Sequence, residues 1–184
     1  MRAFVAVFPP PEVRRIALES ARSGARGLGD RVRWTRPEYV HLTLKFLGEV
    51  PEGEIEQIGA ALRKACADHA PFDASLSSFG GFPSARRARV IWAGAAAGSE
   101  ELRALAAGVE AAFEPLDFGR EDRTFVPHVT LGRARGKPVR LELPPVVPGE
   151  PGFEISRVEL MDSRLAAGGA VYETLHSLAL RSGC

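Results

Sequence analysis

Two tetrapeptides, His41-Leu42-Thr43-Leu44 and His128-Val129-Thr130-Leu131, repeat one pattern of histidine, aliphatic residue, threonine and leucine. Each stands in a run of aliphatic and β-branched residues that is typical of a β-strand. Alternate residues of a strand face the same side, so each copy directs an imidazole and a hydroxyl one way and two aliphatic side chains the other. We therefore predict two strands that carry matching polar pairs.

The two motifs lie nearly half the chain length apart, and similar patterns of strands and helices surround each of them. We predict helices over residues 12–28 and 99–113 and a third that opens at Pro51. Strands are expected over residues 40–47, 72–79, 90–93, 126–132, 153–165 and 170–180. Residues 80–84 and 138–151 are expected to form loops, the second with a short edge strand, and residues 166–169 a hairpin turn.

This order of elements predicts an α+β fold rather than a doubly wound parallel sheet. We expect two pseudo-symmetric, mostly antiparallel sheets with outer helices, which face each other across a central cleft. Residues 1–184 would form a single two-lobed domain, long enough to bury a core of its own. A monomer is expected because one chain supplies both walls of the cleft.

Composition limits the classes of function. The net charge is +1, so no strong overall field attracts polyanions, and affinity for nucleic acid must come from a local basic cluster. No apolar run is long enough to span a membrane. The two cysteines, Cys66 and Cys184, do not make a disulfide framework, which favours reduced thiols and a cytoplasmic location.

Strict alternation assigns the remaining residues of the motif strands. It places Lys45 on the face of His41 and Thr43, where its ammonium group would contact a phosphate or stay solvated. It places Phe46 on the opposite face, in the core. In the second strand it places Arg133 opposite His128, as a structural ion pair, unless the strand bends at Gly132.

The chemistry of this set of side chains suits attack on a phosphodiester. Histidine has an ordinary pKa near 6.5, so one neutral and one protonated imidazole make a general base and a general acid. Thr43, Thr130 and Lys45 can donate hydrogen bonds to the phosphate oxygens. No cysteine pairs and no His-Glu helix motif are present, so we expect no metal and no cofactor.

A family resemblance follows from the residues around the motifs. The segment Trp34–Gly48, which reads Trp-Thr-Arg-Pro-Glu-Tyr-Val-His-Leu-Thr-Leu-Lys-Phe-Leu-Gly, resembles the first signature of the two-histidine phosphoesterase superfamily. Residues 127–133, Pro-His-Val-Thr-Leu-Gly-Arg, resemble the second. The similarity is greatest to the bacterial and archaeal RNA 2′,3′-cyclic phosphodiesterases, also called 2′-5′ RNA ligases, and it covers nearly the whole chain.

That resemblance implies the bilobal fold and hydrolysis of RNA 2′,3′-cyclic phosphate ends, such as those of tRNA fragments, to a 2′-phosphate. It implies that His41 donates a proton to the leaving 3′-oxygen and that His128 accepts one from water. From the residues alone the two histidines are interchangeable. With an RNA 5′-hydroxyl in place of water, the same site would form a 2′-5′ linkage.

Other functions stay open at this point. The same fold could act on small cyclic nucleotides, serve physiologically as a 2′-5′ ligase, or bind RNA or nucleotides without catalysis. The cluster of Arg86, Arg87 and Arg89 beside a glycine-rich loop favours RNA, if at least one of them contacts its backbone. Neither His69 nor His176 has a threonine two residues later, and neither is a candidate for catalysis.

Overall fold

The computed structural model describes residues 1–119, 121, 123–166 and 169–181, and within these ranges nine strands and three α-helices follow one another. The strands are β1 (Arg2–Val7), β2 (Val32–Trp34), β3 (Leu42–Glu49), β4 (Phe72–Phe82), β5 (Val90–Ala95), β6 (His128–Ala134), β7 (Gly152–Ile155), β8 (Arg157–Ala166) and β9 (Gly169–Ala179). The helices are α1 (Pro11–Gly24), α2 (Ile55–Ala67) and α3 (Ser99–Phe113).

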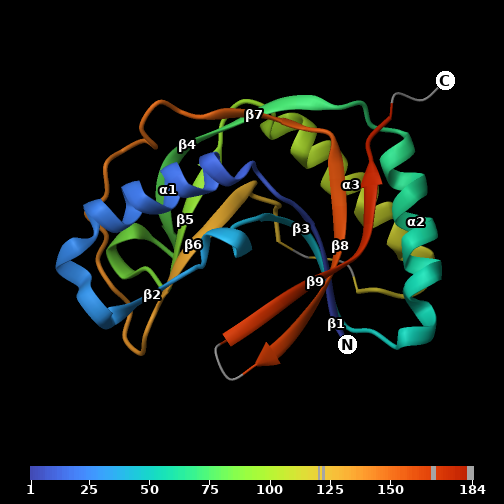
Figure 1. Cartoon of the computed structure of the whole chain (residues 1–184), viewed down its shortest axis with the longest axis horizontal. Coiled ribbons are helices and arrows are strands. Elements are labelled where there is room, and N and C mark those ends of the chain that lie inside the picture. The colour runs from blue at the N-terminus through green and yellow to red at the C-terminus, as the bar shows by residue number, and fades with distance from the viewer. Residues whose placement is uncertain (120, 122, 167–168, 182–184) are drawn as a thin grey trace.

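The strands pair in the order β7-β4-β5-β6-β3-β1-β8-β9, and β2 pairs with β6 beside this path. Each of these pairings is antiparallel, which confirms the predicted α+β class with mostly antiparallel strands. One half of the sheet contains β4, β5 and β6 and the other contains β3, β1, β8 and β9. The halves meet where β3 pairs with β6, at the centre of the curled sheet in Figure 1.

All three helices bury apolar side chains in one core cluster. Leu18 of α1, Leu62 of α2 and Leu105 of α3 are among its fully buried residues, together with Leu42 and Val129 from the two motif strands. Figure 1 shows α1 beside one half of the sheet and α2 and α3 beside the other. The helices therefore cover the face of the sheet to which the aliphatic residues of the motifs point.

Two strands differ from the sequence prediction. Gly80 and Gly81 of the predicted loop belong to β4, because they pair with Trp92 and Ile91 of β5. A Cβ at Gly80 would lie only 2.2 Å from the Trp92 ring, so glycine suits this position. The single strand expected over residues 153–165 is interrupted at Ser156. Its first part pairs with β4 as β7, and its second part pairs with β1 and β9 as β8.

The C-terminal hairpin is present, since β8 pairs with β9 up to Ala166 and Gly169. Ala167 and Gly168 of the predicted turn lie outside the described residues. A helix needs about 20 residues to span a bilayer, and α1 and α3 have 14 and 15. In the described part of the chain, no helix is long and apolar enough to cross a membrane.

Candidate active site

The two motifs lie side by side where β3 meets β6. Leu42 is opposite Val129 in this pairing, and both side chains are fully buried in the core. Because side chains alternate along a strand, their neighbours point to the other side of the sheet. We call that side the motif face, and it carries His41, Thr43, His128 and Thr130.

Both motif histidines are held by the same local hydrogen bond. Nδ1 of His41 lies 2.7 Å from the carbonyl oxygen of Tyr39, and Nδ1 of His128 lies 2.6 Å from that of Val126. A carbonyl oxygen only accepts, so Nδ1 must carry the proton that is donated in each bond. Nε2 of each ring is then the basic nitrogen of the neutral form, and it donates when the ring is protonated.

Burial favours the neutral form of both imidazoles by lowering their pKa values. Desolvation lowers the pKa of His41 to about 4, although the carbonyl of Tyr39 favours the protonated ring. The positive charges of Arg133 and Arg14, and His128 itself, lower it further. The pKa of His128 is also lowered, chiefly by burial and then by Arg133. A bound phosphate would oppose these shifts, because a nearby negative charge stabilises the imidazolium.

Aromatic rings fix the orientation of His41. The Phe4 ring is stacked on it at a centroid distance of 4.9 Å, Phe8 lies at 5.3 Å, and the edge of Tyr172 lies at 5.5 Å. These rings supply the burial that lowers the pKa of His41. They also restrict the imidazole to one orientation on the motif face.

A second group of rings surrounds His128 in the other half of the sheet. Phe82 meets His128 edge-on at 5.0 Å, and Trp92 lies 6.1 Å away. Trp92 therefore forms part of the wall around the site. Trp34 of β2, by contrast, is half-buried and packs against the core.

Each motif strand contains a β-bulge three residues after its histidine. On β3, Thr43 and Lys45 pair with consecutive residues of β1, so Leu44 is the extra residue. On β6, Thr130 and Gly132 pair with consecutive residues of β5, so Leu131 is extra. A bulge sets two residues of one strand against one of its partner, so the alternation of faces shifts by one residue beyond it.

The first bulge makes the prediction for Lys45 wrong. Instead of pointing to the motif face, the Lys45 side chain turns to the helix side, where it is 3% exposed and forms an ion pair with Glu110 of α3. Nζ donates to both carboxylate oxygens of Glu110, with Oε1 at 2.7 Å, and also to the carbonyl oxygen of Gly119 at 2.9 Å. Lys45 is therefore a structural residue.

Phe46 changes face for the same reason. It was predicted to be in the core, but it is 67% exposed and pairs with Phe4 of β1 on the motif face, with ring centroids 6.3 Å apart. An exposed aromatic ring thus stands beside the group that holds His41. Strict alternation misses it, and its position depends on the bulge at Leu44.

The second bulge brings Arg133 onto the motif face. Arg133 pairs with Val90 and follows the extra residue Leu131, so it shares the face of His128 rather than the opposite one. Its charge acts on both His41 and His128. No hydrogen bond or ion pair links the guanidinium group of Arg133 to another residue that the structure describes. The predicted structural ion pair is therefore wrong, and the guanidinium is available to an anion.

The hydroxyls of Thr43 and Thr130 are also available. Both side chains are half-buried on the motif face, and neither hydroxyl is hydrogen-bonded to the described part of the protein. In the same part, no group of three or more histidine, cysteine, aspartate or glutamate residues has the arrangement of a metal site. The motif face offers imidazoles, hydroxyls and a guanidinium.

The other predicted candidates lie elsewhere. A Cβ at Gly59 of α2 would come within 2.7 Å of Nε2 of His176, and one at Gly108 of α3 within 2.8 Å of Nε2 of His69, so both histidines pack against helices. Arg86 and Arg87 are exposed in a short 3₁₀ helix, and Arg89 donates to the carbonyl oxygen of Gly136 at 3.3 Å. A contact of this arginine cluster with RNA stays a prediction.

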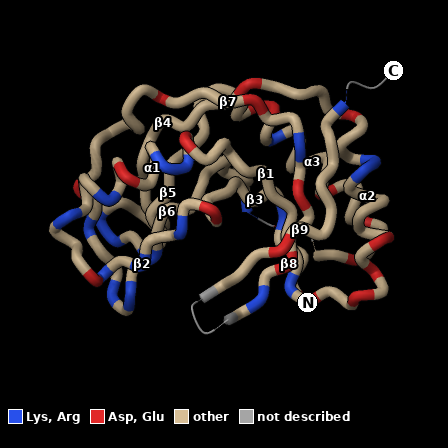
Figure 2. Tube along the Cα trace, in the orientation of Figure 1, with Lys and Arg blue, Asp and Glu red and all other residues tan. Residues whose placement is uncertain are grey.

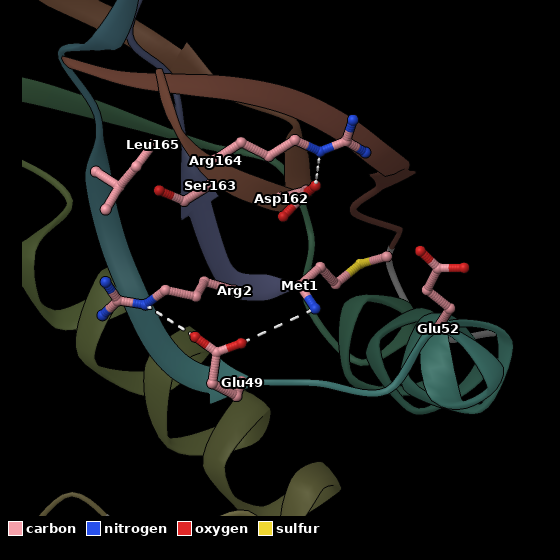
Figure 3. Close-up of a pocket in the computed structure, with 8 residues that line it drawn as sticks. All are labelled: Met1, Arg2, Glu49, Glu52, Asp162, Ser163, Arg164 and Leu165. Atoms are coloured by element: carbon pink, nitrogen blue, oxygen red, sulfur yellow. Dashed lines mark hydrogen bonds and ion pairs between the residues drawn. The ribbon is translucent and has the colours of Figure 1, made fainter. Parts of the chain in front are cut away.

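A cavity of about 450 Å³ lies beside the N-terminus, and Figure 3 shows the eight residues that line it. Its charged groups largely pair with one another: Glu49 contacts Arg2 and the terminal amine, and Nε of Arg164 lies 2.6 Å from buried Asp162. Asp162 follows Met161, which packs with Phe4 and Tyr172 on the motif face. This cavity contains none of the motif residues.

Comparison with known proteins is consistent with this geometry. The family model of the 2′-5′ RNA ligase superfamily matches residues 9–166, which include both motifs. The chain belongs to this superfamily. The chain is similar to an RNA 2′,3′-cyclic phosphodiesterase of Thermus thermophilus, at 37% identity over 98% of this chain and 91% of the relative. Another, from Methanothermobacter thermautotrophicus, is 31% identical over 98% and 99%.

Solved structures of superfamily members share the fold. The crystal structure of TT0787 from Thermus thermophilus has a TM-score of 0.86 and 35% identity, and the match covers 99% of both chains. Escherichia coli LigT complexed with 3′-AMP has a TM-score of 0.84 over 97% of both chains, at 24% identity. The curled antiparallel sheet is therefore the fold of this superfamily.

Proposed function

We propose that this chain is an RNA 2′,3′-cyclic phosphodiesterase that opens the cyclic phosphate to a 2′-phosphate without a metal ion. The observation that carries the proposal is the matched pair of His41 and His128, each with its Nδ1 proton held by the carbonyl two residues earlier. This arrangement leaves two Nε2 atoms on one face, free to move protons. The names of the superfamily relatives support the same reaction.

In the proposed reaction, a water oxygen attacks phosphorus while the bond from phosphorus to O3′ breaks. Nε2 of neutral His128 takes the proton from water, and Nε2–H of protonated His41 gives one to O3′. The product carries a 2′-phosphate and a free 3′-hydroxyl. The two histidines have exchanged protonation states, and proton exchange with solvent restores them.

The other groups on the motif face stabilise the charge of the transition state. Thr43 and Thr130 donate hydrogen bonds to the phosphate oxygens that take no part in bond cleavage. Arg133 adds a fixed positive charge and a planar pair of donors, which matches phosphate geometry. Lys45 has no part in this proposal, because Glu110 already holds its ammonium group.

The test is turnover of a short RNA that ends in a 2′,3′-cyclic phosphate, with chelator present and with the 2′- and 3′-phosphate products resolved. We expect the wild type to give only the 2′-phosphate. His41→Ala and His128→Ala should each lose about 10²–10⁴-fold in rate. His69→Ala is the matched control, because this histidine packs against α3, and its rate should stay at the wild-type level.

Three outcomes would count against the proposal. Loss of the rate in chelator, restored by zinc or magnesium, would contradict the metal-independent mechanism. Turnover that survives both histidine substitutions would contradict acid–base catalysis. Absence of turnover together with RNA binding that is lost in His41→Ala would favour a non-catalytic binding module.

The same chemistry allows 2′-5′ ligation. An RNA 5′-hydroxyl that enters in place of water would attack the same phosphorus and displace O3′, which yields a 2′-5′ linkage. Water is far more concentrated than any RNA end, so hydrolysis should dominate. A substrate drawn from tRNA fragments, a monomeric enzyme and a cytoplasmic location all stay predictions.

A further inference from the structure

Beside the motif face lies a small basic pocket where β2 pairs with β6. It has a volume of about 320 Å³ and is lined by Arg33, Arg133, Ala134 and Arg135. Figure 2 shows several blue Lys and Arg segments around β2 and the adjoining end of β6. Its three guanidinium groups come from two neighbouring segments of chain.

Arg33 and Arg133 are directly opposite each other in the antiparallel pairing of β2 with β6. Directly opposed residues of such a pair have Cα atoms about 4.5–5.5 Å apart and side chains on the same face. Val32 packs with Ile91 in a core cluster, so its neighbour Arg33 points to the other side, which is the motif face. The two guanidinium groups therefore share one side of the sheet.

Two like charges placed directly opposite each other destabilise a strand pair. No hydrogen bond or ion pair from another described residue reaches the guanidinium groups of Arg33, Arg133 and Arg135, and all three side chains are exposed. The repulsion is therefore not relieved within that part of the protein. A bound anion would relieve it, and a phosphate suits the planar guanidinium fork.

Arg33 is opposite Arg133, four residues along β6 from Val129, whose pairing with Leu42 places both motif histidines. Arg33 lies on β2, outside the two motif strands. A phosphate held by Arg33 is a different group from the one that reacts between His41 and His128. In RNA with a 3′-terminal cyclic phosphate, every other phosphate lies on the 5′ side.

We infer that Arg33 and Arg135, next to Arg133, form a second phosphate subsite that binds the internucleotide phosphate on the 5′ side of the reacting nucleotide. The inference rests on the proposed function. It identifies the substrate class as oligonucleotide ends rather than cyclic mononucleotides. Arg33 acts in binding and does not touch the reacting atoms.

The experiment compares kcat/KM for adenosine 2′,3′-cyclic phosphate with that for a diadenylate that ends in the same cyclic phosphate. We expect the wild type to prefer the dinucleotide. Arg33→Ala should lose about tenfold on the dinucleotide, the size expected for a charge-assisted hydrogen bond, and stay at the wild-type level on the mononucleotide. In Arg33→Ala, the slope of log kcat/KM for the dinucleotide against log salt concentration should become shallower by about 0.7.

Two controls separate this subsite from general charge effects. Arg63→Ala removes the same charge from an exposed position on α2, on the helix side of the sheet, and should change neither substrate. A dinucleotide with an uncharged methylphosphonate linkage should show no loss in Arg33→Ala.

Different results would overturn different claims. Equal losses on both substrates, no loss on either, or a loss that persists with methylphosphonate would overturn the subsite and leave the proposed reaction intact. If the wild type turned over neither cyclic phosphate, both the proposed function and the subsite would be wrong. Melting temperatures of the variants check that each one is folded.

Discussion

Phe46 and Arg133 occupy equivalent positions on the two motif strands, five residues after His41 and His128 and just beyond the bulges at Leu44 and Leu131. Both point to the motif face, although strict alternation assigns them to the opposite one. The pseudo-symmetric site thus presents an exposed aromatic ring on one side and an exposed guanidinium group on the other. A nucleotide has both a base to stack and a phosphate to neutralise.

Replacement of Phe46 by alanine should weaken substrate binding with little effect on stability. The ring is 67% exposed, and stacking of a base on an aromatic side chain is worth about 1–3 kcal/mol. We expect KM for an RNA cyclic phosphate to rise about tenfold, while the free energy of unfolding changes by about 0.5 kcal/mol. Leu165→Ala, at another exposed apolar position, is the control for KM. An unchanged KM in Phe46→Ala would show that the ring does not stack.

Replacement of Arg133 by glutamine should have two separable effects. Loss of a donor to the transition-state charge should lower kcat/KM by about 10²-fold. Removal of a positive charge near both histidines should raise the pKa of His41 and of His128, because this charge lowers each of them in the wild type. NMR titration of the imidazoles measures the shift, and Arg63→Gln is the control. Unchanged imidazole pKa values would contradict this placement of Arg133.

Replacement of Lys45 by methionine should affect stability rather than substrate binding. The replacement removes the cation of a largely buried ion pair and leaves the Glu110 carboxylate without it. This should lower the free energy of unfolding by about 3 kcal/mol. The double replacement Lys45→Met with Glu110→Met should recover most of that loss. Denaturant unfolding measures both effects, and KM measured on the folded variants should match the wild type. A rise in KM with unchanged stability would restore Lys45 as a phosphate ligand.

The pH dependence of kcat/KM should be bell-shaped, with its maximum at acidic pH. Catalysis requires one protonated and one neutral histidine, and both pKa values lie below 6.5 in the free protein, that of His41 at about 4. Above this range both rings are neutral and the acid is lost; below it both are protonated and the base is lost. The phosphate raises these pKa values, so the alkaline limb of kcat should lie at higher pH. A profile flat from about pH 5 to 9 would contradict paired histidine catalysis.

The leaving group can assign the two histidines. A p-nitrophenyl phosphodiester releases a stable phenolate that needs no proton from a general acid. His41→Ala should therefore lose much less rate on this ester than on the RNA cyclic phosphate, whereas His128→Ala should be impaired on both. The reverse pattern would exchange the roles of acid and base. Equal impairment of both variants on both substrates would mean that neither histidine acts as a simple acid.

The sequence predicts those parts of the site that depend on local periodicity. Helix α3 has the predicted boundaries, and the class of fold is as expected. The four residues of the His-x-Thr pairs lie on one face, as alternation requires. Gly80, by contrast, is predicted from the sequence to lie in a loop, whereas in the structure it is a strand residue against which the Trp92 ring of the neighbouring strand packs. Its role comes from a contact with another strand.

The sequence by itself determined the two polar pairs, because a strand places residues i and i+2 on the same side whatever its partners are. The tertiary structure decided the faces of Lys45, Phe46 and Arg133, because a bulge exists only in the register between two strands. The pairings of β3 with β1 and of β6 with β5 set that register. As a result, the Lys45 ammonium group pairs with Glu110. Arg133, opposite Arg33, faces the site instead.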